Sequence, residues 1–173
     1  MGIVSRLLWP DERFDGFGSI TPEFLRSQGV SALICDIDNT LVTYDDPEPT
    51  EQAGAWLREM LSSGIRIAFV SNNRPARVEL FNRSVGAPAY GDAGKPKRKY
   101  LDIVMSEMGK TPEECAVLGD QLFTDVFSGK RVGTKAYLVP PIKDKKTLLF
   151  RFKRALEKPI LKAYERSRKR NKS

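Results

Sequence analysis

Polar residues that could carry out chemistry stand in four short groups, each following an apolar run or a turn. The groups are Asp36-Ile37-Asp38-Asn39-Thr40, Ser71-Asn72-Asn73, Gly94-Lys95-Pro96, and Gly119-Asp120 with Asp125. Carboxylates and lysine can act as nucleophiles, proton carriers or metal ligands. The carboxyl ends of neighbouring parallel strands converge at one edge of a sheet. If the apolar runs are such strands, the four groups form one active site.

The first group contains two acids at a spacing that suits phosphate chemistry. Asp36 and Asp38 are two positions apart, so an extended chain puts both carboxylates on one face. Leaving the strand spreads them towards opposite ends of a phosphate. Two neighbouring carboxylates perturb each other's titration, which suits one nucleophile and one proton carrier. An Asp-rich turn has the same composition, so the pair indicates a catalytic site only together with the other groups.

The elements that would position these groups alternate along the chain. Apolar runs predict strands at 30–37, 65–70, 89–90, 115–118 and 135–139. Helical spacing of apolar residues predicts helices at 50–63 and 96–108, with further helices after the second and fourth strands. We therefore expect an α/β fold: a doubly wound three-layer α/β/α sandwich around a mainly parallel five-stranded sheet.

The chain of 173 residues fits one domain with a lead-in and a tail. We expect residues 1–30 to pack on the core as a lead-in and residues 31–141 to form the catalytic domain. Pro140-Pro141 closes that domain, and residues 142–173 form a basic helical tail.

The tail holds thirteen Lys or Arg against three Asp or Glu, whereas residues 1–141 have a slight excess of acids. Its residues from Lys145 to Lys169 are compatible with a helix, which Pro159 is predicted to interrupt. Three alternatives stay open for this segment. It could bind an anionic phospholipid surface, it could bind nucleic acid or a ribosome through the phosphate backbone, or its apolar residues could pack on the protein's own domain.

The composition excludes several other mechanisms. No histidine is present, which rules out a Ser-His-Asp triad and a histidine zinc site within this chain. No Gly-rich Walker loop is present either. Cys35 and Cys115 lie inside apolar runs, so we expect buried thiols in a reducing, cytoplasmic setting.

In their order, the four groups resemble the motifs of the haloacid dehalogenase (HAD) superfamily, subclass IIIA. Within it the chain is similar to the YqeG-like branch, which also holds the mitochondrial and plant phosphatidylglycerophosphate phosphatases. The resemblance is carried by Ile20-Thr21-Pro22-Glu23, Ile37 to Val42, Ser71-Asn72-Asn73, Lys95-Pro96 and Gly119 to Asp125. It implies a magnesium-dependent phosphatase that acts through an aspartyl-phosphate, with a HAD-like catalytic domain.

The resemblance implies the catalytic and metal-binding roles. Asp36 would attack phosphorus, and Asp38 would donate a proton to the leaving oxygen and later take one from water. Lys95 would offset the charge on the transferring phosphoryl group. Asp36, the backbone carbonyl of Asp38, and Asp120 would be the ligands of Mg²⁺.

The same resemblance implies the phosphate-binding and supporting residues. Ser71 and Asn72, together with Lys95, would bind the phosphate of the substrate. Thr40 and Asp125 would support the site, with Asp125 orienting Lys95 or a water on the metal.

The gaps between the groups leave no room for a cap domain, the inserted unit with which HAD enzymes generally choose substrates. Between Asp38 and Ser71 lie 32 residues, and between Ser71 and Lys95 lie 23. An uncapped site is open, so its substrate would be large, membrane-borne or macromolecular unless a partner chain closes it. Phosphatidylglycerophosphate is the candidate substrate that the resemblance implies, with a cytoplasmic protein peripheral to the inner face of the membrane.

Overall fold

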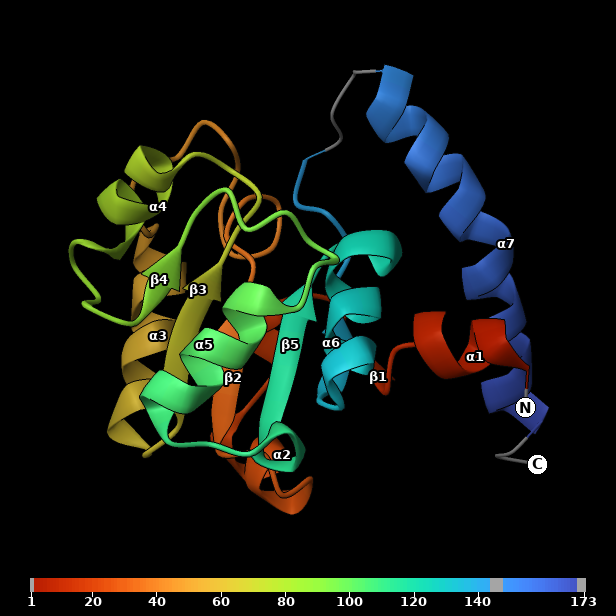
Figure 1. Cartoon of the computed structure of the whole chain (residues 1–173), viewed down its shortest axis with the longest axis horizontal. Helices are drawn as coiled ribbons and strands as arrows, with labels where there is room; N and C mark the ends of the chain where they lie inside the picture. Colours follow the sequence, from red (N-terminus) through yellow and green to blue (C-terminus); the bar gives the residue numbers. More distant parts are fainter. Residues whose placement is uncertain (1, 144–147, 171–173) are drawn as a thin grey trace.

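A parallel sheet of six strands forms the centre of the protein in the computed structural model, which describes residues 2–143 and 148–170 (Figure 1). The strands are β1 (Glu12–Arg13), β2 (Ala32–Cys35), β3 (Arg66–Val70), β4 (Ala89–Tyr90), β5 (Cys115–Gly119) and β6 (Lys135–Leu138). Their order across the sheet is β1-β6-β5-β2-β3-β4, and all five pairings are parallel. The doubly wound α/β prediction is confirmed, although the sheet has one strand more than the five predicted.

The additional strand, β1, comes from the lead-in and pairs with the edge of β6. Two backbone N–H groups of the lead-in fix it: that of Asp11 donates to the Ala136 carbonyl at 2.8 Å, and that of Phe14 to the Leu138 carbonyl at 2.9 Å. The Asp11 carboxylate accepts a further bond from the Ala136 N–H at 2.7 Å. The strand is held by bonds to backbone groups and to one acid. Its two residues, Glu12 and Arg13, are both charged, so the sequence has no apolar pattern there from which a strand could be predicted.

Seven helices among the described residues accompany the sheet. They are α1 (Ile3–Leu8), α2 (Pro22–Ser27), α3 (Glu51–Ser62), α4 (Pro75–Asn82), α5 (Lys99–Met108), α6 (Phe127–Val132) and α7 (Leu148–Arg170). Buried residues of α2, α3 and α4 join one apolar cluster with Leu33 and Cys35 of β2. Those of α5 and α6 join a second cluster with Ala32 and Ile34. Alternate residues of β2 therefore face opposite helical layers, which is the three-layer sandwich.

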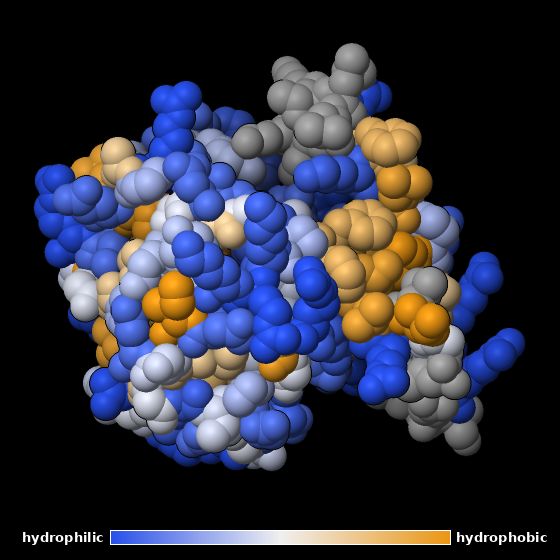
Figure 2. All heavy atoms as spheres, in the orientation of Figure 1, coloured by the Kyte–Doolittle hydropathy of each residue, from blue (hydrophilic) through white to orange (hydrophobic). Residues whose placement is uncertain are grey.

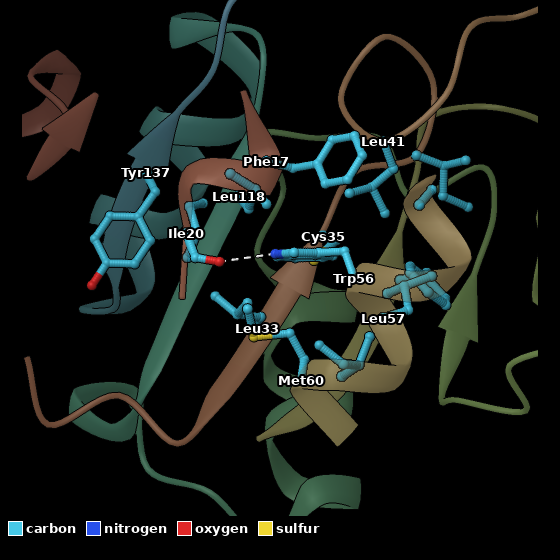
Figure 3. Packing of buried hydrophobic residues seen from close by; sticks show 14 of the residues in the cluster. Phe17, Ile20, Leu33, Cys35, Leu41, Trp56, Leu57, Met60, Leu118 and Tyr137 are labelled. Carbon is cyan, nitrogen blue, oxygen red and sulfur yellow. Dashed lines mark hydrogen bonds between the residues drawn. The ribbon is translucent and has the colours of Figure 1, made fainter. Parts of the chain in front are cut away.

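The larger cluster is centred on Trp56 of α3 (Figure 3). The hydroxyl of Thr50 caps this helix by accepting a bond from the Ala53 N–H at 3.2 Å. The Trp56 indole N–H donates to the Ile20 carbonyl at 2.9 Å, which joins the segment before α2 to the core. Both partners are buried, so this bond satisfies polar groups that water cannot reach.

The predicted helix starting at Pro96 begins later, at Lys99. The Lys97 N–H donates to the Gly94 carbonyl at 3.0 Å and closes a turn that contains Pro96. The Lys95–Pro96 peptide bond within this turn is cis. The segment thus presents Lys95 from a turn instead of from the first residue of a helix.

Pro159 does not interrupt the tail helix as predicted, because it lies inside α7. Ile160 and Leu161 pack on an apolar cluster formed with η3 (Leu122–Val126) and β6, and this packing supports the helix beyond the proline. Near its C-terminal end, Tyr164 contacts Trp9 with ring centroids 5.9 Å apart. Figure 1 shows α7 beside α1. The predicted helical residues 145–147 lie outside the described residues.

No helix within residues 2–143 or 148–170 combines the length and the apolar character needed to cross a bilayer.

Replacing Trp56 with Phe should destabilise the fold, because it leaves the Ile20 carbonyl buried without its donor. We expect the free energy of unfolding to fall by about 1–3 kcal/mol, measured by urea denaturation. Leu61→Ala on the exposed side of the same helix is the control, with an expected change within about 0.5 kcal/mol. Equal stability of Trp56→Phe and the parent protein would contradict the assigned bond.

Candidate active site

The carboxyl ends of β2, β3 and β5 open onto one cavity of about 220 Å³. Its lining residues are Asp36, Asp38, Tyr44, Ser71, Asn72, Asn73, Lys95, Gln121, Thr124 and Asp125. Six of the predicted site residues are in this list. Of the other two, Thr40 donates to the Asp36 carboxylate at 3.3 Å, and Asp120 lies beside the cavity in contact with α7. The fold therefore brings all the predicted site residues into one region.

Lys95 connects the first and fourth sequence groups. Its Nζ donates to Asp36 Oδ1 at 2.8 Å and to Asp125 Oδ1 at 2.6 Å, and all three side chains are buried. Burial disfavours the lysine charge, but Asp125 and Asp36 outweigh that effect and raise the pKa of Lys95. The lysine therefore stays positively charged next to the carboxylate at the end of β2.

Asp36, Asp120 and Asp125 form a compact acidic cluster in which one oxygen from each lies within 4.8 Å of the others. Burial is the main cause that raises the pKa of Asp36 to about 6 and that of Asp120 to about 8; the neighbouring carboxylates raise both further. Lys95 opposes the rise at both acids, and Arg154 opposes it at Asp120. Both acids therefore hold their protons more tightly than an exposed aspartate does.

These residues fit a hard divalent cation. The Asp120 side chain is fully buried, and its Oδ1 has no hydrogen-bond partner among the described residues. Carboxylate oxygens are the ligands that Mg²⁺ prefers, and a cation here would satisfy that oxygen. The Asp38 side chain lies outside the cluster, and its predicted metal role uses the backbone carbonyl.

The cluster depends on a glycine at the end of β5. A Cβ added to Gly119 would lie 2.2 Å from Cγ of Asp125, which is far below a normal contact distance. Asp125 also accepts a bond from the Gln121 N–H at 3.1 Å. The Asp125 side chain therefore folds back over the strand end, where only glycine leaves it space, and reaches Lys95 from there.

Asp38 is held by two residues of the segment that follows β3. Asn73 Nδ2 donates to one carboxylate oxygen at 2.8 Å, and Arg77 Nη2 donates to the other at 3.0 Å. Arg77 also binds the carbonyls of Asp46 and Pro47, both at 2.7 Å, so it fixes the loop after β2. The sequence analysis missed Arg77, since an arginine in the first turns of a helix is ordinary. Its nearness to the Ser71 group is the only signal in the sequence.

Ser71 and Asn72 lie at the end of β3, where their side chains already have protein partners. Ser71 Oγ accepts a bond from the Asn73 N–H at 3.1 Å. Asn72 Oδ1 accepts from the Lys95 backbone N–H at 2.7 Å, and Nδ2 donates to the Lys95 carbonyl at 3.4 Å. Asn72 thus holds the Lys95 backbone in addition to lining the cavity. The predicted contacts of both residues with phosphate stay predictions.

Four lining residues were not predicted as site residues: Tyr44, Asn73, Gln121 and Thr124. Burial, followed by the carboxylates of Asp120 and Asp36, raises the pKa of Tyr44, which therefore remains a protonated phenol. Thr124 Oγ1 donates to Asp125 at 3.3 Å. Tyr44 comes from an irregular loop that has no pattern in the sequence, whereas Gln121 and Thr124 lie within the fourth sequence group.

The tail helix also reaches this region, which the sequence did not predict for any particular residue. Arg154 contacts both the carboxylate and the carbonyl of Asp120, the latter at 2.6 Å from Nη1. Glu157 accepts from the Leu122 N–H at 2.8 Å and from Arg154 at 2.8 Å. Two side chains of α7 therefore contact the strand-end loop that carries a cluster carboxylate.

This fold and site have relatives among known proteins. A family model described as haloacid dehalogenase-like hydrolase matches residues 20–133. The chain is 38% identical over 164 residues to "Probable phosphatase YqeG" of Bacillus subtilis (strain 168), covering 95% of each chain. An uncharacterized protein from Listeria monocytogenes serotype 4b gives a TM-score of 0.54 at 17% identity, covering 68% of this chain and 85% of that one. A Legionella pneumophila protein described as a HAD superfamily (subfamily III A) hydrolase gives 0.52 at 23%, covering 68% and 71%.

A parallel α/β sheet with a lysine and a carboxylate cluster at the ends of its central strands defines a hydrolase of the HAD type. The chain belongs to the haloacid dehalogenase-like hydrolase family. Its 38% sequence identity to the YqeG protein confirms the predicted YqeG-like branch.

The raised pKa values of Asp36 and Asp120 predict how the stability of the metal-free protein depends on pH. Both acids keep their protons in the folded state at pH values where the unfolded chain, with a value of 3.8, has lost them. The folded state therefore loses stability as pH rises from about 4 to about 8. In EDTA, we expect the Tm to be at least about 3 °C lower near pH 8 than near pH 5.5.

Asp120→Asn should reduce this pH-dependent loss, because the substituted amide does not ionise. Asp15→Asn, at an exposed position, should leave the loss as in the parent protein. Scanning calorimetry in EDTA measures both. An identical pH dependence in Asp120→Asn and the parent protein would show that Asp120 ionises normally.

Proposed function

We propose that this protein is a magnesium-dependent phosphatase that hydrolyses a phosphate monoester through an aspartyl-phosphate on Asp36. The observation that carries this proposal is the position of Asp36, which is buried at the strand end, bonded to charged Lys95 and open to the cavity. A carboxylate next to a fixed positive charge can attack the phosphorus of an anionic substrate, because the lysine offsets the repulsion.

In the first step, a carboxylate oxygen of Asp36 forms a bond to phosphorus while the bond from phosphorus to the leaving oxygen breaks. Asp38 donates a proton to that leaving oxygen, so an alcohol departs. Arg77 and Asn73 hold the Asp38 carboxylate through one bond to each oxygen. Lys95 stays next to Asp36 and offsets the negative charge on the phosphoryl group.

In the second step, water attacks the aspartyl-phosphate, and Asp38 takes the proton that the water loses. The bond from phosphorus to Asp36 breaks, which releases inorganic phosphate and restores the carboxylate. Asp38 thereby regains the proton that it gave to the leaving oxygen in the first step.

Mg²⁺ is the proposed cofactor, with Asp36, Asp120 and the Asp38 carbonyl as its protein ligands. When bound, it would neutralise charge on the phosphate and orient it for in-line displacement. Asp125 completes the acidic cluster and orients Lys95 through its 2.6 Å bond.

Phosphatidylglycerophosphate is the proposed substrate. The chain between Asp38 and Lys95 forms a loop, α3, β3, α4 and β4, with no inserted domain to cover the cavity. A phosphate at the surface of a membrane could enter such an open site. The resemblance to the branch that holds phosphatidylglycerophosphate phosphatases supports the same substrate.

An anionic membrane surface is the proposed partner of the first turns of α7. Phe152 is 62% exposed and Leu156 is 46% exposed, and their spacing of four puts them on one side of the helix. Arg154, between them in the sequence, contacts Asp120. The exposed pair therefore lies on the turns of α7 that also carry Arg154, on another side of the helix. Figure 2 shows further apolar surface over the region where α7 lies beside α6 and α1.

The test of this function is phosphate release from p-nitrophenyl phosphate and from phosphatidylglycerophosphate in mixed micelles, with Mg²⁺ or EDTA. We expect faster turnover of the lipid, loss of activity in EDTA, and a fall in kcat of at least about 10³-fold in Asp36→Asn. Asp15→Asn is the control and should keep full activity. Full activity of Asp36→Asn would disprove the aspartyl-phosphate, and turnover of the small ester alone would disprove the lipid substrate.

Arg77 should affect kcat more than KM, because it orients Asp38 for proton transfer. We expect Arg77→Ala to lower kcat about 10²-fold with a nearly unchanged KM for p-nitrophenyl phosphate. Arg83→Ala, at an exposed position just after α4, is the matched control. An unchanged kcat in Arg77→Ala would show that Arg77 does not orient Asp38 for proton transfer.

A further inference from the structure

We infer that Arg154 and Glu157 of α7 are positioning residues for the cation site: they fix Asp120 so that one of its oxygens faces the acidic cluster. This inference rests on the magnesium site of the proposed function. It assigns to the basic tail a part in the active site that is separate from any partner that the tail binds.

The first observation is that one guanidinium group holds two different atoms of the same residue. Arg154 Nη1 donates to the Asp120 carbonyl at 2.6 Å, and Nη2 contacts Asp120 Oδ2. Holding the backbone and the carboxylate together restricts rotation of the side chain between them, since the planar fork has a fixed geometry. Oδ2 is thereby occupied, and the buried Oδ1 is left for the cluster with Asp36 and Asp125.

The second observation is that Glu157 fixes Arg154 and the same loop. One oxygen of Glu157 accepts from Arg154 Nη1 at 2.8 Å, and the other accepts from the Leu122 N–H at 2.8 Å. Glu157 is only 2% exposed, although acids are seldom fully buried without a partner. Its two bonds compensate for that burial and hold the loop at two positions, Asp120 through Arg154 and Leu122 directly.

The third observation is that α7 is held in place by contacts distant from the site. Ile160 and Leu161 pack on the cluster formed with η3 and β6. Arg168 donates to Glu12 of β1 at 2.9 Å, and Arg13 forms an ion pair with Glu165. The position of Arg154 is thus set by packing and ion pairs that do not involve the cation.

Groups that hold a metal ligand from behind control how well that ligand binds. Removing such a partner lowers metal affinity by roughly 10- to 100-fold in general, because the ligand then samples orientations that do not coordinate. Removing a positive charge near the site has the opposite effect and raises the metal affinity, because that charge repels the cation. The sign of the change in Mg²⁺ affinity therefore distinguishes positioning from repulsion.

The experiment measures Mg²⁺ binding to the full chain without substrate, by isothermal titration calorimetry and by the Mg²⁺-dependent rise in Tm. Arg154→Met keeps the apolar stem of the side chain and removes its donors, and we expect the Kd for Mg²⁺ to rise roughly 10- to 100-fold. Arg154→Lys restores one donor and should recover part of the affinity. Arg151→Met, exposed three residues earlier on α7, should bind Mg²⁺ like the parent protein.

Glu157→Gln is a second variant for the case in which Arg154→Met does not fold, because the amide oxygen can still accept from the Leu122 N–H. It should also weaken Mg²⁺ binding, since it removes the charge that holds Arg154. Unchanged or tighter binding in a folded Arg154→Met, or in Glu157→Gln if that variant alone folds, would overturn the inference. Absence of Mg²⁺ binding in the parent protein would instead overturn the magnesium site of the proposed function.

Discussion

The structure depends on placing three carboxylates in a buried position around a single lysine at the end of a parallel sheet. Asp36, Asp120 and Asp125 come from two neighbouring strand ends, so the pairing of β2 with β5 brings them together. Burial opposes the ionisation of Asp36 and Asp120, and Lys95 offsets only part of that effect. Carboxylate oxygens gathered in a buried position are the ligands that a hard divalent cation prefers, so the cluster fits such a cation.

The remaining elements support this cluster from several sides. Gly119 gives Asp125 the space to fold back over β5, and Asn72 holds the backbone of Lys95. Arg77 connects the loop after β2 to Asp38. On the opposite side, α7 contacts Asp120 through Arg154. The supporting groups are mostly hydrogen-bonded to backbone atoms, so they fix the shape of the loops as well as the side chains.

The tail illustrates how the same residues can serve packing and chemistry together. One part of α7 packs Ile160, Leu161 and Tyr164 against the body of the protein, while Phe152 and Leu156 near its start remain exposed. Helical periodicity predicted an amphipathic helix in this segment but not which residues face the protein. That distinction requires the position of the helix, because buried and exposed apolar residues look the same in sequence.

The sequence by itself determined the alternation of strands and helices and the order of the four polar groups. Both follow from local apolar patterns and from the rule that parallel strands end at one edge of the sheet. Only the tertiary structure decided the sixth strand, the start of α5 and the continuity of α7 through Pro159. Only it revealed the contacts of Arg77 and Arg154 with active-site carboxylates. These features come from contacts between residues distant along the chain, and no local pattern in the sequence records such contacts.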